Sequence, residues 1–103
     1  MKLYMVRKTL ENGVKEYASA GMTFSTKSSK GWGRIGNLKN AFWNRIGWKS
    51  WETTKSDAFI NWVDWETRNG GVIDVIEIDI DEVVVTQTPI QDWFNLNMNK
   101  GDK

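Results

Sequence analysis

The 103-residue sequence contains no cysteine and no histidine. Without cysteine, the chain can form no disulfide, iron–sulfur cluster or cysteine-ligated zinc site, and it offers no thiol nucleophile. Without histidine, it lacks the usual general base and the usual transition-metal ligand, so a Ser-His-Asp triad is impossible. We therefore expect no catalytic residues, no bound metal and no cofactor.

Long apolar runs are also missing. No stretch approaches the roughly 18 residues that a transmembrane helix needs, and no apolar segment follows a basic start as in a signal peptide. The length suits one domain, and 40% hydrophobic residues are enough for a single core. These features predict one soluble domain located in the cytoplasm.

The net charge of +1 conceals an asymmetry along the chain. Residues 1–56 carry 11 basic and 3 acidic side chains, whereas residues 57–103 carry 3 basic and 10 acidic ones. Either the halves neutralise each other within the fold, or each presents a charged face, the basic one to nucleic acid or to an acidic protein. We favour mutual neutralisation, because both halves must share one small core.

Alternating side chains predict a β-hairpin near the N-terminus. Residues 3–10 and 14–20 have strand patterns, and Asn12-Gly13 between them favours a type I′ turn, which needs positive φ at both central positions. Met22 and Phe24 predict a further short extended piece, followed by a loop.

Two helices are predicted in the middle of the chain. Asn37 can cap the first, which ends before Gly47; its apolar stripe consists of Leu38, Ala41, Phe42 and Ile46. The second begins after Thr54 or Ser56 and stops at Asn69-Gly70-Gly71, and residues 47–55 connect the two. One side of this second helix carries Phe59, Trp62, Val63 and Glu66, although residues 59–63 are also compatible with a strand.

The C-terminal part begins with the longest β pattern, residues 72–85. It exceeds a typical strand, so we expect a bulge or turn near Asp81-Glu82. Thr88-Pro89-Ile90-Gln91 then has the residues of a capping box and predicts a short helix carrying Trp93-Phe94. Residues 95–103 are polar and are expected to fray.

These elements predict a single α+β domain over residues 1–94. We expect a small antiparallel sheet with one or two helices packed on one face.

Gly31-Trp32-Gly33-Arg34-Ile35-Gly36 matches the G-x-G-x-x-G pattern of dinucleotide-binding proteins. Its context argues against that function, because no buried strand precedes it and the chain is too short for a doubly wound domain. A simpler alternative is a phosphate held at the start of the first helix, near Lys27, Lys30, Arg34 and Lys39. The other interpretation is a glycine loop with solvated lysines.

Glu77, Asp79 and Asp81 are spaced by two and would line one face of a strand. Paired carboxylates can hold Mg²⁺, but such a site would require ligands from another segment as well. We favour a solvent-exposed face, or one paired with lysines of the first hairpin.

Seven tryptophans are the most unusual feature of the composition. Tryptophan is enriched at binding hot spots, and aromatic rings interleaved with cations can stack on nucleobases. We therefore predict a partner-binding surface in a basic-aromatic segment, residues 32–51, although core packing would also explain the rings. The segment comprises Trp32, Arg34, Lys39, Trp43, Arg45, Trp48, Lys49 and Trp51.

Three short motifs carry a resemblance. The opening Met1-Lys2-Leu3-Tyr4-Met5-Val6-Arg7, the helix start Gly36-Asn37-Leu38-Lys39-Asn40-Ala41 and the strand Ile73-Asp74-Val75-Ile76-Glu77-Ile78 resemble small uncharacterised accessory proteins of tailed bacteriophages. Relative to that pattern, residues 47–71 look like an insertion. The resemblance implies a protein that acts in the host cytoplasm and that binds, and inhibits or redirects, a host protein.

Two classes of function therefore remain. The first is a non-enzymatic phage protein that binds a host macromolecule, such as a defence component. The second is a small nucleic-acid-binding module that uses residues 32–51. Salt dependence of binding to generic DNA or RNA would distinguish them.

We predict no hydrolytic activity from the carboxylates of residues 77–81, because they lie on one strand without partners from elsewhere. Titration with Mg²⁺ or Mn²⁺ should neither raise the melting temperature nor produce nuclease activity. DNA or RNA cleavage that is lost in Asp79→Asn would contradict this prediction.

Overall fold

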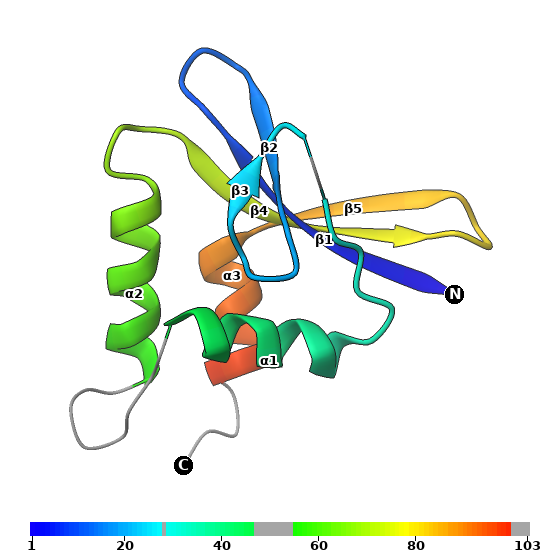
Figure 1. Ribbon diagram of the computed structural model, residues 1–103. Helices are drawn as coiled ribbons and strands as arrows, with labels where there is room; N and C mark the ends of the chain where they lie inside the picture. Colours follow the sequence, from blue (N-terminus) through cyan, green and yellow to red (C-terminus); the bar gives the residue numbers. More distant parts are fainter. Residues whose placement is uncertain (28, 47–54, 100–103) are drawn as a thin grey trace.

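Five strands form one antiparallel sheet in the order β3-β2-β1-β4-β5 (Figure 1). The computed structural model describes residues 1–27, 29–46 and 55–99. The strands are β1 (Lys2–Thr9), β2 (Lys15–Ala18), β3 (Phe24–Ser25), β4 (Val72–Asp79) and β5 (Val84–Pro89). β1 is the central strand, and β3 and β5 are the two edges.

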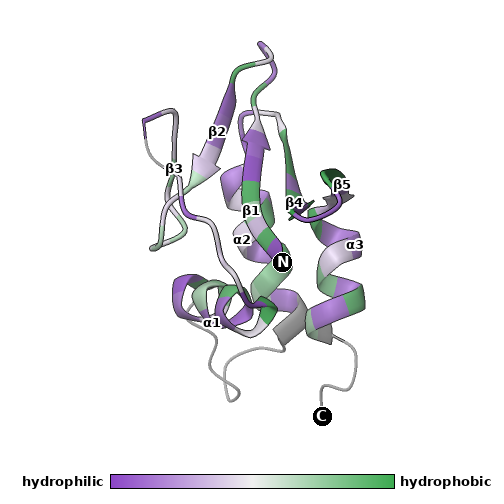
Figure 2. Ribbon diagram, turned by 90° about the vertical axis from the view of Figure 1, so that its right-hand side faces the viewer, coloured by the Kyte–Doolittle hydropathy of each residue, from purple (hydrophilic) through white to green (hydrophobic). Residues whose placement is uncertain are grey.

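The described part of the chain also forms three α-helices, whereas one or two were expected to pack on the sheet. They are α1 (Ile35–Ile46), α2 (Lys55–Glu66) and α3 (Ile90–Phe94), and one π-helical turn, η1 (Asn95–Asn99), follows α3. Figures 1 and 2 show α1 and α3 towards the lower end of the sheet. The α+β fold, with an antiparallel sheet in a single domain, is confirmed.

The pairing of β1 with β4 runs along the full length of both strands. Val6 lies opposite Val75, and Lys8 lies opposite Ile73. Directly paired residues share a face, so Val6, Ile73 and Val75 project into the same hydrophobic core. The helices therefore cover this one face of the sheet.

The predicted strand over residues 72–85 is two strands. β4 ends at Asp79, β5 begins at Val84, and the two pair antiparallel. The expected turn near Asp81-Glu82 is thereby confirmed, and within it Val83 adopts a left-handed φ of 57°.

The predicted N-terminal hairpin is also present, but its turn is of a different type. β1 pairs with β2, with Arg7 opposite Tyr17. Gly13 has a positive φ of 88°, whereas Asn12 does not. The N–H of Gly13 donates to the carbonyl of Leu10, and the N–H of Leu10 donates to that of Val14, which closes a three-residue loop rather than a type I′ turn.

Aromatic rings from all three helices fill the core. The ring of Phe42 in α1 lies 5.4–6.3 Å from those of Phe59, Trp62 and Trp93, measured between centroids. Phe59 stacks on Phe94 at 4.0 Å. Because such rings bury large apolar areas, this cluster accounts for much of the hydrophobic stabilisation.

Two predictions near the C-terminus are corrected by the structure. α3 begins at Ile90 without a side-chain cap, because Thr88 and Pro89 belong to β5, so the predicted capping box does not form. Residues 95–99, predicted to fray, form η1, and Met98 there is buried in the core. Burial of this one apolar side chain fixes the turn despite its polar neighbours.

The two long helices form close to where they were predicted. α1 begins at Ile35, before the predicted cap Asn37, and buries Leu38 and Phe42 as expected. α2 buries Phe59 and Trp62, so the alternative of a strand over residues 59–63 is wrong. This part of the chain, which looked like an insertion, contributes directly to the core.

Gly70 and Gly71 reverse the chain between α2 and β4. Both have positive φ, 91° and 96°, and a Cβ on Gly71 would lie 2.7 Å from the carbonyl oxygen of Thr9. A backbone atom cannot move aside as a flexible side chain can. Glycine is therefore required at position 71 both by the backbone conformation and by the space available.

We predict that Gly71→Ala lowers the free energy of unfolding by about 2–4 kcal/mol, because it adds a backbone clash to the cost of positive φ. Gly13→Ala is the matched control: its φ is similar, but nothing lies within 4 Å of the added Cβ. It should cost only about 1–2 kcal/mol. Urea unfolding of both variants tests this, and equal losses would contradict it.

Candidate functional site

Ion pairs join the basic half of the chain to the acidic half. Among the described residues, every ion pair joins a positive group of residues 1–56 to an acidic residue of 57–103, and one of these positive groups is the N-terminal ammonium, which pairs with Asp81. The side-chain pairs are Lys2–Glu77, Arg7–Asp74, Lys8–Glu66 and Arg45–Glu66. Lys2, Arg7, Lys8 and Arg45 are thus neutralised by the acidic half within the fold, which agrees in part with the mutual neutralisation that the sequence analysis favoured.

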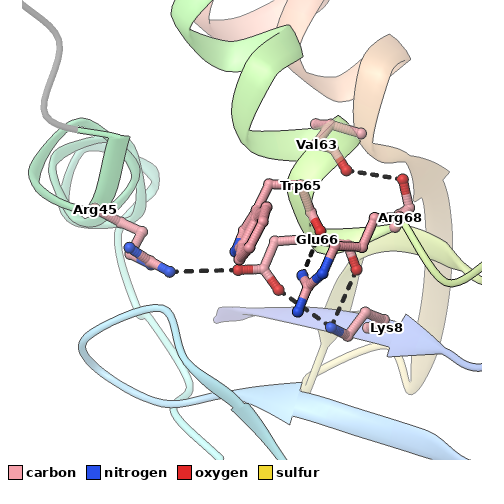
Figure 3. A network of polar contacts seen from close by, with 7 residues as sticks. Lys8, Arg45, Val63, Trp65, Glu66 and Arg68 are labelled. Carbon is pink, nitrogen blue, oxygen red and sulfur yellow. Dashed lines mark hydrogen bonds and ion pairs between the residues drawn. The ribbon is translucent and has the colours of Figure 1, made fainter.

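Glu66, in the last turn of α2, is the centre of a polar network that joins three elements (Figure 3). The Lys8 ammonium of β1 donates to the Glu66 carboxylate at 3.1 Å and to its backbone carbonyl at 3.3 Å. Arg45, near the end of α1, donates to the other carboxylate oxygen at 3.4 Å. The side chains of Lys8 and Glu66 are only 12% and 11% exposed, so this pair is shielded from water.

Trp65 lies beside this network and is directed outward. It is 58% exposed, whereas Trp32, Trp62 and Trp93 are buried. The guanidinium of Arg68 lies 3.7 Å from the centroid of the Trp65 ring and donates to the Trp65 carbonyl at 2.6 Å. A cation–π contact and a hydrogen bond together hold Arg68 against the indole. We call Trp65, Arg68 and Arg45 the Trp65 surface.

A hollow of about 430 Å³ adjoins the Trp65 surface. It lies between the tip of the β1–β2 hairpin and the end of α2, and its charged lining residues are Lys8, Glu11, Glu66 and Arg68. Two positive and two negative groups give it no net charge. It therefore has no preference for a strongly charged ligand, although it can accommodate a polar side chain of a partner.

The basic-aromatic segment is only partly within the described residues. Trp32 is buried and pairs with Tyr4 through two backbone hydrogen bonds of 2.8 Å. Trp43 is half-buried and meets Phe94 edge-on at 6.1 Å. Arg34 is exposed, and Lys39 is half-buried. Three members, Trp48, Lys49 and Trp51, lie outside the described residues.

Of the members of that segment that the structure describes, Arg45 alone belongs to the Trp65 surface. The rings of Trp32 and Trp43 pack against the core, so in the described part of the segment the cations are more accessible than the aromatics. A binding surface over residues 32–51 as a whole stays a prediction.

The glycine motif has no geometry of a phosphate-binding loop. Gly33 and Gly36 have open space where a Cβ would lie, whereas Gly31 is crowded by the side chain of Leu3. None of the three has a positive φ. Gly31 therefore packs closely against β1, and the described strand nearest before it is the two-residue, half-buried β3.

Of the carboxylates singled out from the sequence, Glu77 pairs with a lysine of the first hairpin, as one of the favoured interpretations had it, whereas Asp79 accepts hydrogen bonds from the backbone N–H groups of Asp81 and Glu82. Lys2 lies 3.1 Å from the Glu77 carboxylate, and a hydrogen bond with Glu77 together with its negative charge raises the pKa of Lys2. Lys8, also expected to face these carboxylates, lies at the other end of β1 and binds Glu66 instead. Nowhere in residues 1–27, 29–46 and 55–99 do three acidic side chains group as metal ligands.

A second buried charge lies on the face of the sheet that the helices leave uncovered. Asp74 is 6% exposed, accepts a hydrogen bond of 3.0 Å from Gln87 and lies 3.7 Å from Arg7. The sequence analysis did not single out this cluster, nor Trp65 and Arg68 as a pair. The available signal for that pair was its spacing of three residues at the end of the predicted second helix, although in the structure α2 ends at Glu66 and Arg68 lies just beyond it.

The chain matches no protein-family model, no curated protein and no solved structure. In the part that the structure describes, no helix is long and apolar enough to cross a membrane. Inference about function therefore depends on the surfaces of the molecule itself.

We predict that Glu66→Gln lowers the free energy of unfolding by about 1–3 kcal/mol, because Lys8 would keep its charge in a shielded position without a counter-charge. Glu77→Gln is the matched control, since its partner Lys2 is open to solvent, and its effect should be clearly smaller. Urea unfolding measures both, and an equal or larger effect of Glu77→Gln would contradict the prediction.

Proposed function

We propose that this protein is a non-enzymatic binding protein that recognises a protein partner through the Trp65 surface. The observation that carries the proposal is the exposed indole of Trp65, with Arg68 held against it at 3.7 Å (Figure 3). A fold that buries three other tryptophans leaves this one in water.

Trp and Arg are the residue types most enriched at energetic hot spots of protein interfaces. An indole supplies a large apolar area at low cost in rotamer entropy, and Arg68 is already held in place by its bond to the Trp65 carbonyl. The neighbouring Glu66 network anchors the end of α2 to β1 and α1. The surface is therefore rigid before a partner arrives, which lowers the entropic cost of binding.

The identity of the partner is proposed from the sequence. The resemblance to accessory proteins of tailed phages suggests a host protein, such as a defence component, that is inhibited or redirected in the host cytoplasm. The balanced charges of the hollow beside Trp65 are consistent with a protein partner, because a nucleic-acid site would be predominantly basic.

Binding of nucleic acid through residues 32–51 is the alternative. Stacking on bases requires exposed ring faces, whereas Trp32 is buried and Trp43 packs on Phe94. The accessible cations of α1 alone would give weak, salt-sensitive and sequence-independent binding.

The proposal is tested by affinity capture from nuclease-treated bacterial lysate, followed by titration with the purified partner. We predict that Trp65→Ala weakens binding at least about tenfold, because it removes the central apolar contact. Ile60→Ala, at a 42% exposed position on the same helix, is the matched control and should bind like the unchanged chain. Circular dichroism verifies that both variants fold.

Undiminished binding by Trp65→Ala would contradict the proposal. Capture that disappears after nuclease treatment, or that falls steeply with salt for any DNA or RNA sequence, would instead support the alternative.

A further inference from the structure

β5 is an edge strand whose outer side is unoccupied. It pairs with β4 on one side, and among the described residues no backbone hydrogen bond joins it to any other element. Figure 1 shows the β4–β5 hairpin extending away from the helices. The side chains of Val84 and Val85 are 48% and 64% exposed, and Val83 in the preceding turn is 84% exposed.

The strand lacks the features that usually protect a sheet edge. Its sequence, VVTQTP, contains no lysine or other charged residue, and its single proline, Pro89, is the last residue. Natural edge strands are commonly short, charged, bulged or interrupted by proline, because an open edge pairs with other chains. The opposite edge, β3, has only two residues and is protected by its shortness.

We propose that β5 pairs antiparallel with β5 of a second copy of this chain, joining the two sheets into one across a two-fold axis. Antiparallel pairing of identical strands is self-complementary, since each N–H and C=O on one edge meets its counterpart on the other. Because the strand contains no charged side chain, its own residues would bring no like charges together in such a pair. Valine and threonine are also among the residues that pair best across strands.

The surroundings of β5 favour a second copy over an unrelated strand. Val85 lies opposite Ile78 on the face that the helices leave uncovered, and Ile80, which follows β4, is 48% exposed. A two-fold axis between the two β5 strands, perpendicular to the sheet, places the apolar side chains of Val85 and Ile78 of both copies on the same face. Two acidic groups close to the strand are neutralised within the chain: Glu77, opposite Thr86, pairs with Lys2, and Asp81 in the turn pairs with the N-terminal ammonium.

This inference is independent of the proposed function. In Figure 1, α2, which carries Trp65, and the β4–β5 hairpin lie on opposite sides of the molecule. Trp65→Ala should therefore leave the self-association unchanged, so that failure of one proposal is distinguishable from failure of the other.

Because the chain contains no cysteine, a disulfide can form only at a cysteine that is introduced. Single variants Val84→Cys, Val85→Cys, Thr86→Cys and Gln87→Cys are oxidised and separated without reducing agent. A disulfide requires Cβ atoms about 3.5–4.5 Å apart, so a symmetric antiparallel pair should cross-link most at the position nearest the two-fold axis and less on either side. Leu96→Cys, 67% exposed but on η1, is the matched control and should remain uncross-linked.

Sedimentation of the unmodified chain provides the second measurement. We expect a dimer whose fraction rises with concentration, and we expect Val85→Lys to shift it to monomer, because each copy would then place a charged side chain in the paired edge. Circular dichroism shows whether this exposed substitution leaves the fold intact. The proposal would be overturned if the chain stayed monomeric up to about 1 mM. It would also be overturned by a dimer that is insensitive to Val85→Lys and that cross-links equally at Leu96→Cys. Pairing of β5 only with a strand of another protein would overturn it too.

Discussion

The pairing of β1 with β4 is the contact on which the other parts of the structure depend. It joins the first residues of the chain to residues 72–79 along the full length of both strands. β2 and β3 are attached through β1, and β5 and α3 follow from β4. The same register places Lys2 near Glu77 and Arg7 opposite Asp74, so the basic and acidic halves neutralise each other where they meet.

A sheet with helices on one face concentrates the aromatic residues there. Phe42, Phe59 and Trp93 come from three different helices and contact one another or shared neighbours in one cluster. Within the described residues the uncovered face has no such layer, and its buried charge, Asp74, interacts with Gln87 and Arg7 instead. The asymmetry leaves two kinds of exposed surface, the end of α2 and the outer edge of β5.

These two surfaces differ in chemistry. The Trp65 surface combines an indole with guanidinium groups and is fixed by a shielded ion pair, which suits a specific protein contact. The β5 edge offers backbone groups and small uncharged side chains, which suits pairing with an identical strand. Self-association through β5 would present two Trp65 surfaces in one assembly and so allow bivalent binding.

Local sequence patterns were sufficient to predict the elements of the fold. The alternation in residues 72–85 and the spacing of Phe59 and Trp62 depend only on which side chains share a face, so the strands and helices were predicted close to their positions. Asn12-Gly13 correctly marked the hairpin loop, but the turn type was wrong, because only Gly13 has a positive φ.

Contacts between distant segments could not be predicted from local sequence patterns. Whether a side chain is buried depends on which segments pack over it, and the local sequence does not show this. The packing of helices and strands decided that Met98 and Trp32 are buried and that Trp65 is exposed. It also decided that Lys8 pairs with Glu66.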